Sequence, residues 1–463
     1  MQGSIAFQTI QTIRPALNEL SHNIWSNPEG PYEEYQASKW TADILRQAGF
    51  HVDTGICSLP TAIMAKWGSG RPVIGFMGEY DALPGLSQEA VPEKRPVSHQ
   101  SYGHGCGHNL LCAAHVGAVI GLKEEMERTG CPGTIVFYGC PGEEVLTGKP
   151  FMAREHAFDD LDLAISFHPA TVNFVFQGIN AGIHSVEFHY KGKSAHAGAD
   201  PQNGRSALDA LELTNVGAQY LREHVTEDVR IHYIIKEGGT APNIVPDKAS
   251  SWYMVRALHM DNLNSVYNRL VKTAQGAASM TETDVDVCYL GGCYPTMQNQ
   301  VLAGLVYDCM KQIPWERFDD KDKEFARALT ADISEGCKNA SALFQIEKGG
   351  LLYEGIRPMK ASNSSGSFDM GDVCHIVPAI MFSTACRPVG VPNHHWRTTA
   401  SSGSGIGERG MINAAKIMAL FGIRAMTDPA ILENARKEFL RSMNGQAYHC
   451  PIPPGASPTK PSI

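Results

Sequence analysis

The chain has 463 residues, of which 43% are hydrophobic and 19% charged, so it can bury a large core and is neither a coiled coil nor a long disordered protein. Its 39 basic and 48 acidic side chains give a formal net charge of −9. This charge argues against nucleic-acid and anionic-membrane partners, because both require excess positive charge. At about 150 residues per domain, the length allows up to three domains.

The sequence also carries information about its compartment. It contains no apolar stretch of about 18 residues, so we expect no membrane span. The first residues, Met1–Ile5, are not a basic segment followed by an apolar run, so we expect no secretory signal. The 12 cysteines are scattered without a paired framework. This usage is typical of a reducing environment, and we predict a cytoplasmic protein.

Helical and strand patterns alternate through most of the chain. Periodic apolar residues predict helices over 5–25, with a kink or break at Pro15, and over 33–48, 113–127 and 405–421. Apolar runs bounded by glycine and proline predict strands over 62–67, 73–77, 134–138, 163–167 and 376–383. This alternation predicts an α/β domain around a mixed, mainly parallel sheet.

A different pattern begins near Gly182. It predicts strands over 185–190, 229–236, 249–258 and 285–289, with helices over 206–223 and 262–279. The order strand–helix–strand–strand–helix–strand is that of a ferredoxin-like α+β domain. We therefore predict two domains and a tail: an α/β domain formed by 1–181 and 295–435, an inserted domain over 182–294, and a C-terminal tail over 436–463. The proline-rich part of the tail, 448–463, is expected to be an extended strap or disordered.

The sharpest chemical signal is Gly103-His104-Gly105-Cys106-Gly107-His108-Asn109. Alternating glycines permit a tight turn from which Cys106 and His108 can reach one ion. Thiolate and imidazole are ligands for zinc and other first-row metals. A glycine-rich turn with Cys106 as a small buried residue explains the same pattern, and the role of His104 stays open.

Two adjacent carboxylates, Glu143 and Glu144, follow the predicted strand over 134–138. Consecutive side chains do not point the same way, so this pair suits two roles, a metal ligand and a general base. The alternative is two solvated glutamates at the start of a helix, where the helix dipole favours negative charge.

The placement of further polar residues favours the metal interpretation. His168, the pair His394 and His395, and the segment 79–84 each follow a predicted strand or lie in the loop after one. A single histidine is more often structural, but the loops after the strands of an open α/β sheet meet at one edge. We therefore expect these groups to meet with Cys106 and Glu144 in a two-metal site.

The inserted domain offers a second set of polar candidates. His196 lies in Gly192–Gly198, and Arg205, Asn243 and Arg256 lie elsewhere in the same domain. Such residues without acidic neighbours suit an oxyanion or a substrate carboxylate. Ordinary turn and surface positions are the alternative for each.

Several of these motifs together resemble a known family. Segments 79–84, 103–109, 141–144 and 194–197 resemble the aminoacylase/carboxypeptidase family of two-metal amidohydrolases, peptidase family M20, subfamily D. The resemblance runs nearly end to end and extends into the tail. It implies a catalytic domain interrupted by a lid and dimerisation domain, and a homodimer or a heterodimer with a related subunit.

The resemblance also implies roles for individual residues. Glu143 would be the general base, Asp81 would orient a metal ligand, and His196 would stabilise the oxyanion from the lid. His394 aligns better than His395, although a slip of one residue stays open. Members of the wider family carry His-x-Asp where this chain has Glu79-Tyr80-Asp81, and His108 would replace that first ligand. The implied metal ligands are Cys106, which would bridge two ions, with His108, Glu144, His168 and His394.

The activity that this resemblance implies is hydrolysis of the amide bond of an N-acyl or N-aroyl amino acid, such as p-aminobenzoyl-glutamate. A water activated by two manganese or zinc ions would attack the carbonyl. Two alternatives are a dipeptidase or other conjugate amidase, and a non-catalytic partner subunit of a heteromeric hydrolase. Every catalytic position is filled, which weighs against the non-catalytic alternative.

Overall fold

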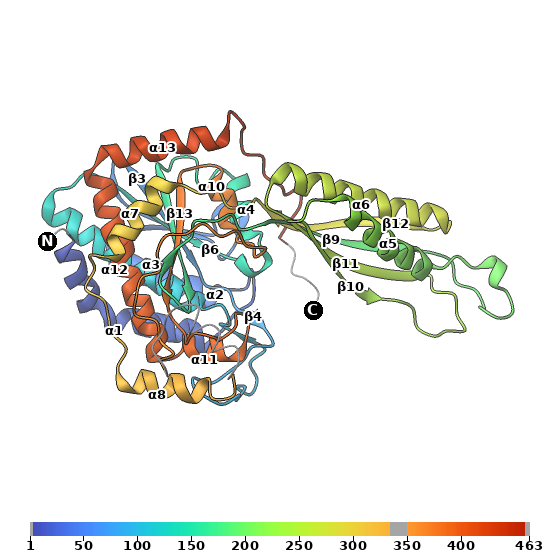
Figure 1. Cartoon of the computed structure of the whole chain (residues 1–463), viewed down its shortest axis with the longest axis horizontal. Helices are drawn as coiled ribbons and strands as arrows, with labels where there is room; N and C mark the ends of the chain where they lie inside the picture. Colours follow the sequence, from blue (N-terminus) through green and yellow to red (C-terminus); the bar gives the residue numbers. More distant parts are fainter. Residues whose placement is uncertain (1–2, 334–349, 459–463) are drawn as a thin grey trace. The chain divides into compact units, whose positions relative to one another are not determined.

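The computed structural model describes residues 3–333 and 350–458 (Figure 1). The chain forms two compact units. The large unit comprises Met1–Gly178, Met297–Ser362 and Val373–His449. The inserted unit comprises Ile179–Thr296 and Asn363–Asp372, with the chain from Cys450 onwards. The last five residues of the predicted tail, 459–463, lie outside the described residues.

A seven-stranded sheet forms the centre of the large unit. Its strands, in spatial order, are β1 (His51–Thr54), β2 (Ile63–Ser69), β6 (Gly133–Cys140), β3 (Val73–Glu79), β7 (Leu163–Ala170), β13 (Ala379–Ala385) and β8 (Phe174–Val175). The four strands β6, β3, β7 and β13 are parallel to one another, whereas the pairs β1–β2, β2–β6 and β13–β8 are antiparallel. Every position of β6 and β13 is buried, as strands covered on both faces require. The predicted mixed, mainly parallel α/β sheet is confirmed.

Helices supply the cover of this sheet. The helices α1 (Ser4–Ser26), α3 (His108–Thr129) and α12 (Gly405–Thr427) pack against one another, and α3 and α12 are buried over most of their length. The other helices of this unit include α2 (Tyr35–Gln47), α4 (Gly148–Arg154), α7 (Gln300–Met310), α8 (Asp320–Leu329), α11 (Trp396–Ser402) and α13 (Pro429–Met443). None of the helices in the described parts of the chain is both long enough and apolar enough to cross a membrane.

Three sequence-based boundaries differ from the structure. Helix α1 continues through Pro15, because its buried face packs along α3 and outweighs the lost backbone hydrogen bond. Helix α3 begins at His108, five residues before the predicted start at 113. The sequence did not indicate this start, because the glycines and histidines there, in a helix buried on all sides, give no amphipathic pattern. The predicted domain boundary at 435 falls inside α13.

The inserted unit has the ferredoxin-like arrangement that the sequence predicts. Its elements in chain order are β9 (Gly182–Lys191), α5 (Ala207–Leu221), β10 (Arg230–Glu237), β11 (Lys248–Ala257), α6 (Met260–Met280) and β12 (Asp284–Cys293). The strands form an antiparallel sheet in the order β10-β11-β9-β12, with both helices against one face (Figure 1). Residues 363–372, which the sequence pattern placed in the second part of the α/β domain, pack with this unit.

Candidate metal centre

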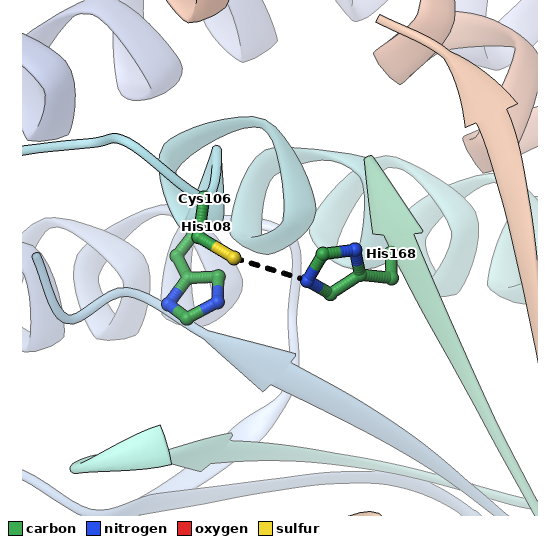
Figure 2. Close-up of side chains that lie close together, drawn as sticks. All are labelled: Cys106, His108 and His168. Carbon is green, nitrogen blue, oxygen red and sulfur yellow. Dashed lines mark hydrogen bonds between the residues drawn. The ribbon is translucent and has the colours of Figure 1, made fainter. Parts of the chain in front are cut away.

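The parallel strands bring residues from distant parts of the sequence to one edge of the large sheet. Cys106 and His108 lie at the turn into α3, and His168 lies near the end of β7 (Figure 2). The sulfur of Cys106 is 3.2 Å from Nε2 of His168. One potential ligand atom from each of the three residues lies within 4.8 Å of the others. We call these three buried side chains the first half-site.

A second group shares Cys106 with the first. Cys106, Glu144 and His394 also place their ligand atoms within 4.8 Å of one another. Nε2 of His394 is 3.6 Å from Oε2 of Glu144. Glu144 belongs to the short 3-10 helix Glu143–Val145 that follows β6, and His394 belongs to the loop after β13. The sulfur of Cys106 therefore stands between two clusters of ligand atoms, and we call the second cluster the second half-site.

The two neighbouring histidines after β13 have different surroundings. His394 takes a left-handed backbone conformation, with φ of 51°, and its side chain faces Glu144. His395 is the N-cap of α11, where its Nδ1 accepts a hydrogen bond from the backbone N–H of Arg397. The structure therefore brings His394, rather than His395, into the group with Cys106.

Asp81 contacts both sides of the centre. Its Oδ1 lies 2.9 Å from Nδ1 of His108, and its Oδ2 accepts a hydrogen bond of 2.8 Å from the backbone N–H of Glu144. The carboxylate is fully buried. Asp81 thus fixes the ring of one candidate ligand, which leaves Nε2 of His108 to face the cluster, and holds the backbone of another.

A buried ion pair adjoins the same histidine. Nζ of Lys149 is 2.5 Å from Oε1 of Glu79, and both side chains are buried. Oε2 of Glu79 lies 3.5 Å from Nε2 of His108, and Oε2 of Glu143 lies 3.7 Å from the same nitrogen. Burial opposes ionisation of Glu79, but Lys149 and His108 outweigh it and lower the pKa of the carboxyl group. Glu79 is therefore an ionised neighbour of the centre.

Burial sets the direction of the pKa shift in three of the candidate ligands. It raises the pKa of the Cys106 thiol to about 12 and that of the Glu144 carboxyl to about 8, and it lowers the pKa of His168 to about 3. Cation binding favours the thiolate and the carboxylate, so it releases protons from these two groups. The neutral imidazole of His168 is already in the form that binds a metal.

The donor set fits divalent cations. Thiol, imidazole and carboxylate are the ligands that zinc and related ions take in proteins. Nε2 of His108 and Oε1 of Glu144 are buried without a hydrogen-bond partner among the described residues. Carboxyl groups of Glu79, Asp81, Glu143 and Glu144 all lie within 4.0 Å of a ring nitrogen of His108. Buried acidic groups gathered in this way favour a compensating cation.

The four candidates of the inserted unit have contacts within that unit. Nδ1 of His196 accepts hydrogen bonds from the N–H groups of Gly198 and Ala199, which leaves Nε2 at the surface. The segment of His196 pairs with that of Asn243 through the N–H of Ala197. The guanidinium of Arg205 forms an ion pair with Glu282, and that of Arg256 donates to Ser367. Their roles toward a substrate stay predictions.

Sequence reasoning gave no role to four residues around the centre. Of these four, only Glu79 could have been identified from the sequence, since it ends β3 two residues before Asp81. Lys149 lies five residues after Glu144, and Arg387 lies seven residues before His394, but neither belongs to a recognised motif. Their contacts with Glu79 and Pro169 arise only through the fold. Glu34 is buried and accepts a hydrogen bond from the N–H of Gly142, the residue before Glu143. His104, whose role the sequence left open, instead contacts the carbonyl of Ile24.

Comparison with known proteins gives the family. Residues 179–279 match the model of a peptidase dimerisation domain named for the M20 family. One of the subunits of the p-aminobenzoyl-glutamate hydrolase of Escherichia coli is 34% identical over 467 aligned residues, which cover 97% of each chain. The chain belongs to the M20 peptidase family. It is a metal-dependent amidohydrolase, as the sequence resemblance predicted.

The chain is also similar to one further relative and to two solved structures. The Xaa-Arg dipeptidase of mouse is 29% identical over 94% of this chain and 91% of its own. An aminobenzoyl-glutamate utilization protein from Klebsiella pneumoniae has a similar fold, with a TM-score of 0.63 and 16% identity over 90% of this chain and 97% of its own. A dinuclear metal-binding M20 peptidase from Bacillus subtilis has a TM-score of 0.60 and 16% identity over 90% of this chain and 99% of its own.

Proposed function

We propose that this M20 protein hydrolyses the amide bond between an acyl or aroyl group and an amino acid, with p-aminobenzoyl-glutamate as the first candidate substrate. The observation that carries the proposal is the position of Cys106 between two ligand clusters, with Glu143 directly beside them. The similarity to the Escherichia coli p-aminobenzoyl-glutamate hydrolase supports the choice of substrate.

The proposed ligands are His108 and His168 on one side of Cys106, and Glu144 and His394 on the other. When bound there, two divalent ions lower the pKa of a water molecule and polarise the amide carbonyl. The fold of a dinuclear M20 peptidase supports two ions, and we propose manganese or zinc. A mixed sulfur, nitrogen and oxygen donor set accepts both, and affinity alone does not select between them.

Glu143 is the proposed general base. Its carboxylate is buried and lies 3.7 Å from Nε2 of His108. In this role it accepts a proton from the attacking water and then donates that proton to the leaving nitrogen. Asp81 does not take part in the proton transfer; it holds His108 and the backbone of Glu144 in place. The products are a carboxylic acid and a free amino acid.

His196 is the proposed donor to the oxyanion, with Asn243, Arg205 and Arg256 as proposed contacts of the substrate. Nε2 of His196 is available for such a bond, because Nδ1 is occupied by two backbone N–H groups. The matched dimerisation domain supports an assembly of two subunits, either identical or related. We also propose a cytoplasmic location, which the free state of every described cysteine supports.

A substrate panel tests the proposal. The chain is purified alone, stripped of metal, and assayed with p-aminobenzoyl-glutamate, N-acetyl amino acids and Xaa-Arg dipeptides, with and without added manganese or zinc. We expect metal-dependent release of glutamate from p-aminobenzoyl-glutamate. Hydrolysis of the dipeptides alone would replace this substrate with the activity named for the mouse relative. A complete lack of turnover with bound metal would favour a non-catalytic subunit.

A single variant tests the role of Glu143. Glu143→Gln keeps the size of the side chain but cannot accept the proton, so turnover should fall by about 100-fold or more while bound metal is retained. The matched control is Glu155→Gln, which alters an exposed glutamate beside Arg154. Equal turnover in Glu143→Gln and Glu155→Gln would refute the assignment of the base.

A further inference from the structure

One buried arginine contacts residues next to a ligand of each half-site. Arg387 follows β13 and is 5% exposed. Among the described residues no carboxylate pairs with it, and its Nε has no hydrogen-bond partner. A guanidinium buried in this way is costly for stability, because it leaves water without a compensating negative charge. Its presence therefore requires an explanation other than core packing.

The contacts of Arg387 connect two candidate metal ligands. Its Nη1 donates a hydrogen bond of 3.2 Å to the carbonyl of Pro169, and its Nη2 donates to Oδ1 of Asn393. The same carbonyl of Pro169 lies 3.0 Å from Nδ1 of His168. Asn393 directly precedes His394. One planar guanidinium therefore contacts both the Pro169 carbonyl, which orients His168, and Asn393, which precedes His394 in the chain.

The contact with Asn393 matters more for metal binding than the contact with Pro169, because His394 lies on an exposed loop. The side chain of His394 is 56% exposed, and its backbone takes a left-handed conformation. A ligand on an exposed loop binds an ion weakly unless the loop is ordered beforehand, because ordering it costs conformational entropy. Other contacts that hold the loop are the N–H of His394 to the carbonyl of Gly105 and the hydroxyl of Thr398 to the carbonyl of Pro392.

From these contacts we infer that Arg387 is a positioning residue that ties the His168 half-site to the His394 half-site and preorganises the second one. The inference rests on the proposed metal ligands. The fork geometry matters, since arginine donates from two separate nitrogens held in one rigid plane, whereas lysine donates from a single nitrogen. Loss of the fork weakens metal binding by the roughly 10–100-fold typical of residues that orient metal ligands. The loss falls mainly on the ion held by Glu144 and His394.

The test is a stepwise titration of metal-free protein with Mn²⁺ and with Zn²⁺ by calorimetry, with bound metal counted by elemental analysis. Wild type should show two binding steps. In Arg387→Met the first step should remain and the second should weaken by about 10–100-fold. Arg387→Lys should behave like Arg387→Met, because it restores the charge but not the two bonds. Two unchanged steps in either variant would overturn the inference.

Two further variants keep the result interpretable. Asn393→Ala removes one contact of Arg387 at an exposed position and leaves the buried guanidinium intact, so it should weaken the second step even if Arg387→Met fails to fold. Arg409→Met removes an arginine that pairs with Asp319, the N-cap of α8, and with Asp322 on α8, and it should reduce stability without changing either step. If wild type itself binds no metal, the proposed function fails rather than the role of Arg387.

Discussion

Asp81 contacts two of the proposed metal ligands at once. Its two oxygens accept bonds from opposite sides, from the ring of His108 and from the backbone N–H of Glu144. An amide in its place still accepts from His108, but its NH₂ group then faces the N–H of Glu144, and two donors repel.

Asp81→Asn should therefore lower metal affinity by about 10–100-fold with little change in volume. Competition with a chelator of known affinity measures this loss. Asp53→Asn, on the partly exposed strand β1, is the control and should bind metal as wild type does. Unchanged affinity in Asp81→Asn would remove Asp81 from the centre.

A buried histidine of the inserted unit makes stability depend on pH. Nδ1 of His184 contacts the hydroxyl of Tyr289, and Nε2 contacts Oδ1 of Asn264. Burial lowers the pKa of His184 from 6.5 to about 4, so folding favours the neutral ring. The stability that it contributes is complete above pH 6.5 and is lost as the pH falls toward 4, by about 3 kcal/mol in all.

His184→Gln should lose this dependence, because an amide does not titrate. Chemical unfolding measured at intervals between about pH 7 and pH 4 gives the free energy of unfolding for both proteins. The difference between wild type and variant should shrink steadily over this range. Parallel curves would show that His184 does not titrate on unfolding.

Much of the candidate site follows from the order of residues along the chain. Cys106, Glu144 and His168 each lie close after a recognisable strand or in a glycine-rich turn, and parallel strands bring such loops to one edge. Lys149 and Arg387 were not predictable in this way. The contacts of Lys149 with Glu79 and of Arg387 with Pro169 arise from packing between segments that have no fixed spacing in the sequence. The contact of Arg387 with Asn393 is local but belongs to no recognised motif.

At the scale of elements, α3 links the metal centre to the core. The glycines of residues 103–107 give no helical pattern before this helix, so the sequence did not predict its first turn, which contains His108. Gly107 is the N-cap, with φ of 88°, and an added Cβ would lie 3.1 Å from the Pro169 ring. The C-cap, Gly130, has φ of 68° and open space around it.

These two glycines form a matched pair. Gly130→Ala should cost about 1–2 kcal/mol of stability, the cost of a left-handed conformation, without affecting metal binding. Gly107→Ala adds a steric clash beside His108, so it should cost more and also weaken metal binding. Thermal unfolding and metal titration of both variants check this. Equal effects of the two substitutions would contradict the tight packing at the start of α3.

The inserted unit could be predicted as a whole because its elements follow one another along the sequence. Alternating strand patterns and two amphipathic helices specify the ferredoxin-like order without long-range information. The packing of residues 363–372 on this unit was not predictable, because that segment is distant in sequence. It is held by bonds such as that between the guanidinium of Arg256 and the hydroxyl of Ser367.

At the scale of the whole molecule, the inserted unit offers a surface for assembly. Strand β10 lies at the edge of its sheet and exposes Ile234 and Ile235. Unpaired edge strands with exposed apolar side chains favour association. The purified chain should therefore form dimers, measurable by light scattering, and Ile235→Lys should shift it toward monomers. A wild-type chain that remains monomeric at high concentration would indicate that a different subunit is required.

We propose that Cys106 holds two metal ions and that amide hydrolysis requires both. The most direct measurement is hydrolysis of p-aminobenzoyl-glutamate by the metal-free chain during titration with Mn²⁺ or Zn²⁺, with bound metal counted at each point. Activity should rise as two ions bind, and Cys106→Ser should bind less metal and lose activity. Full activity without metal, or two bound ions and full activity in Cys106→Ser, would contradict the account.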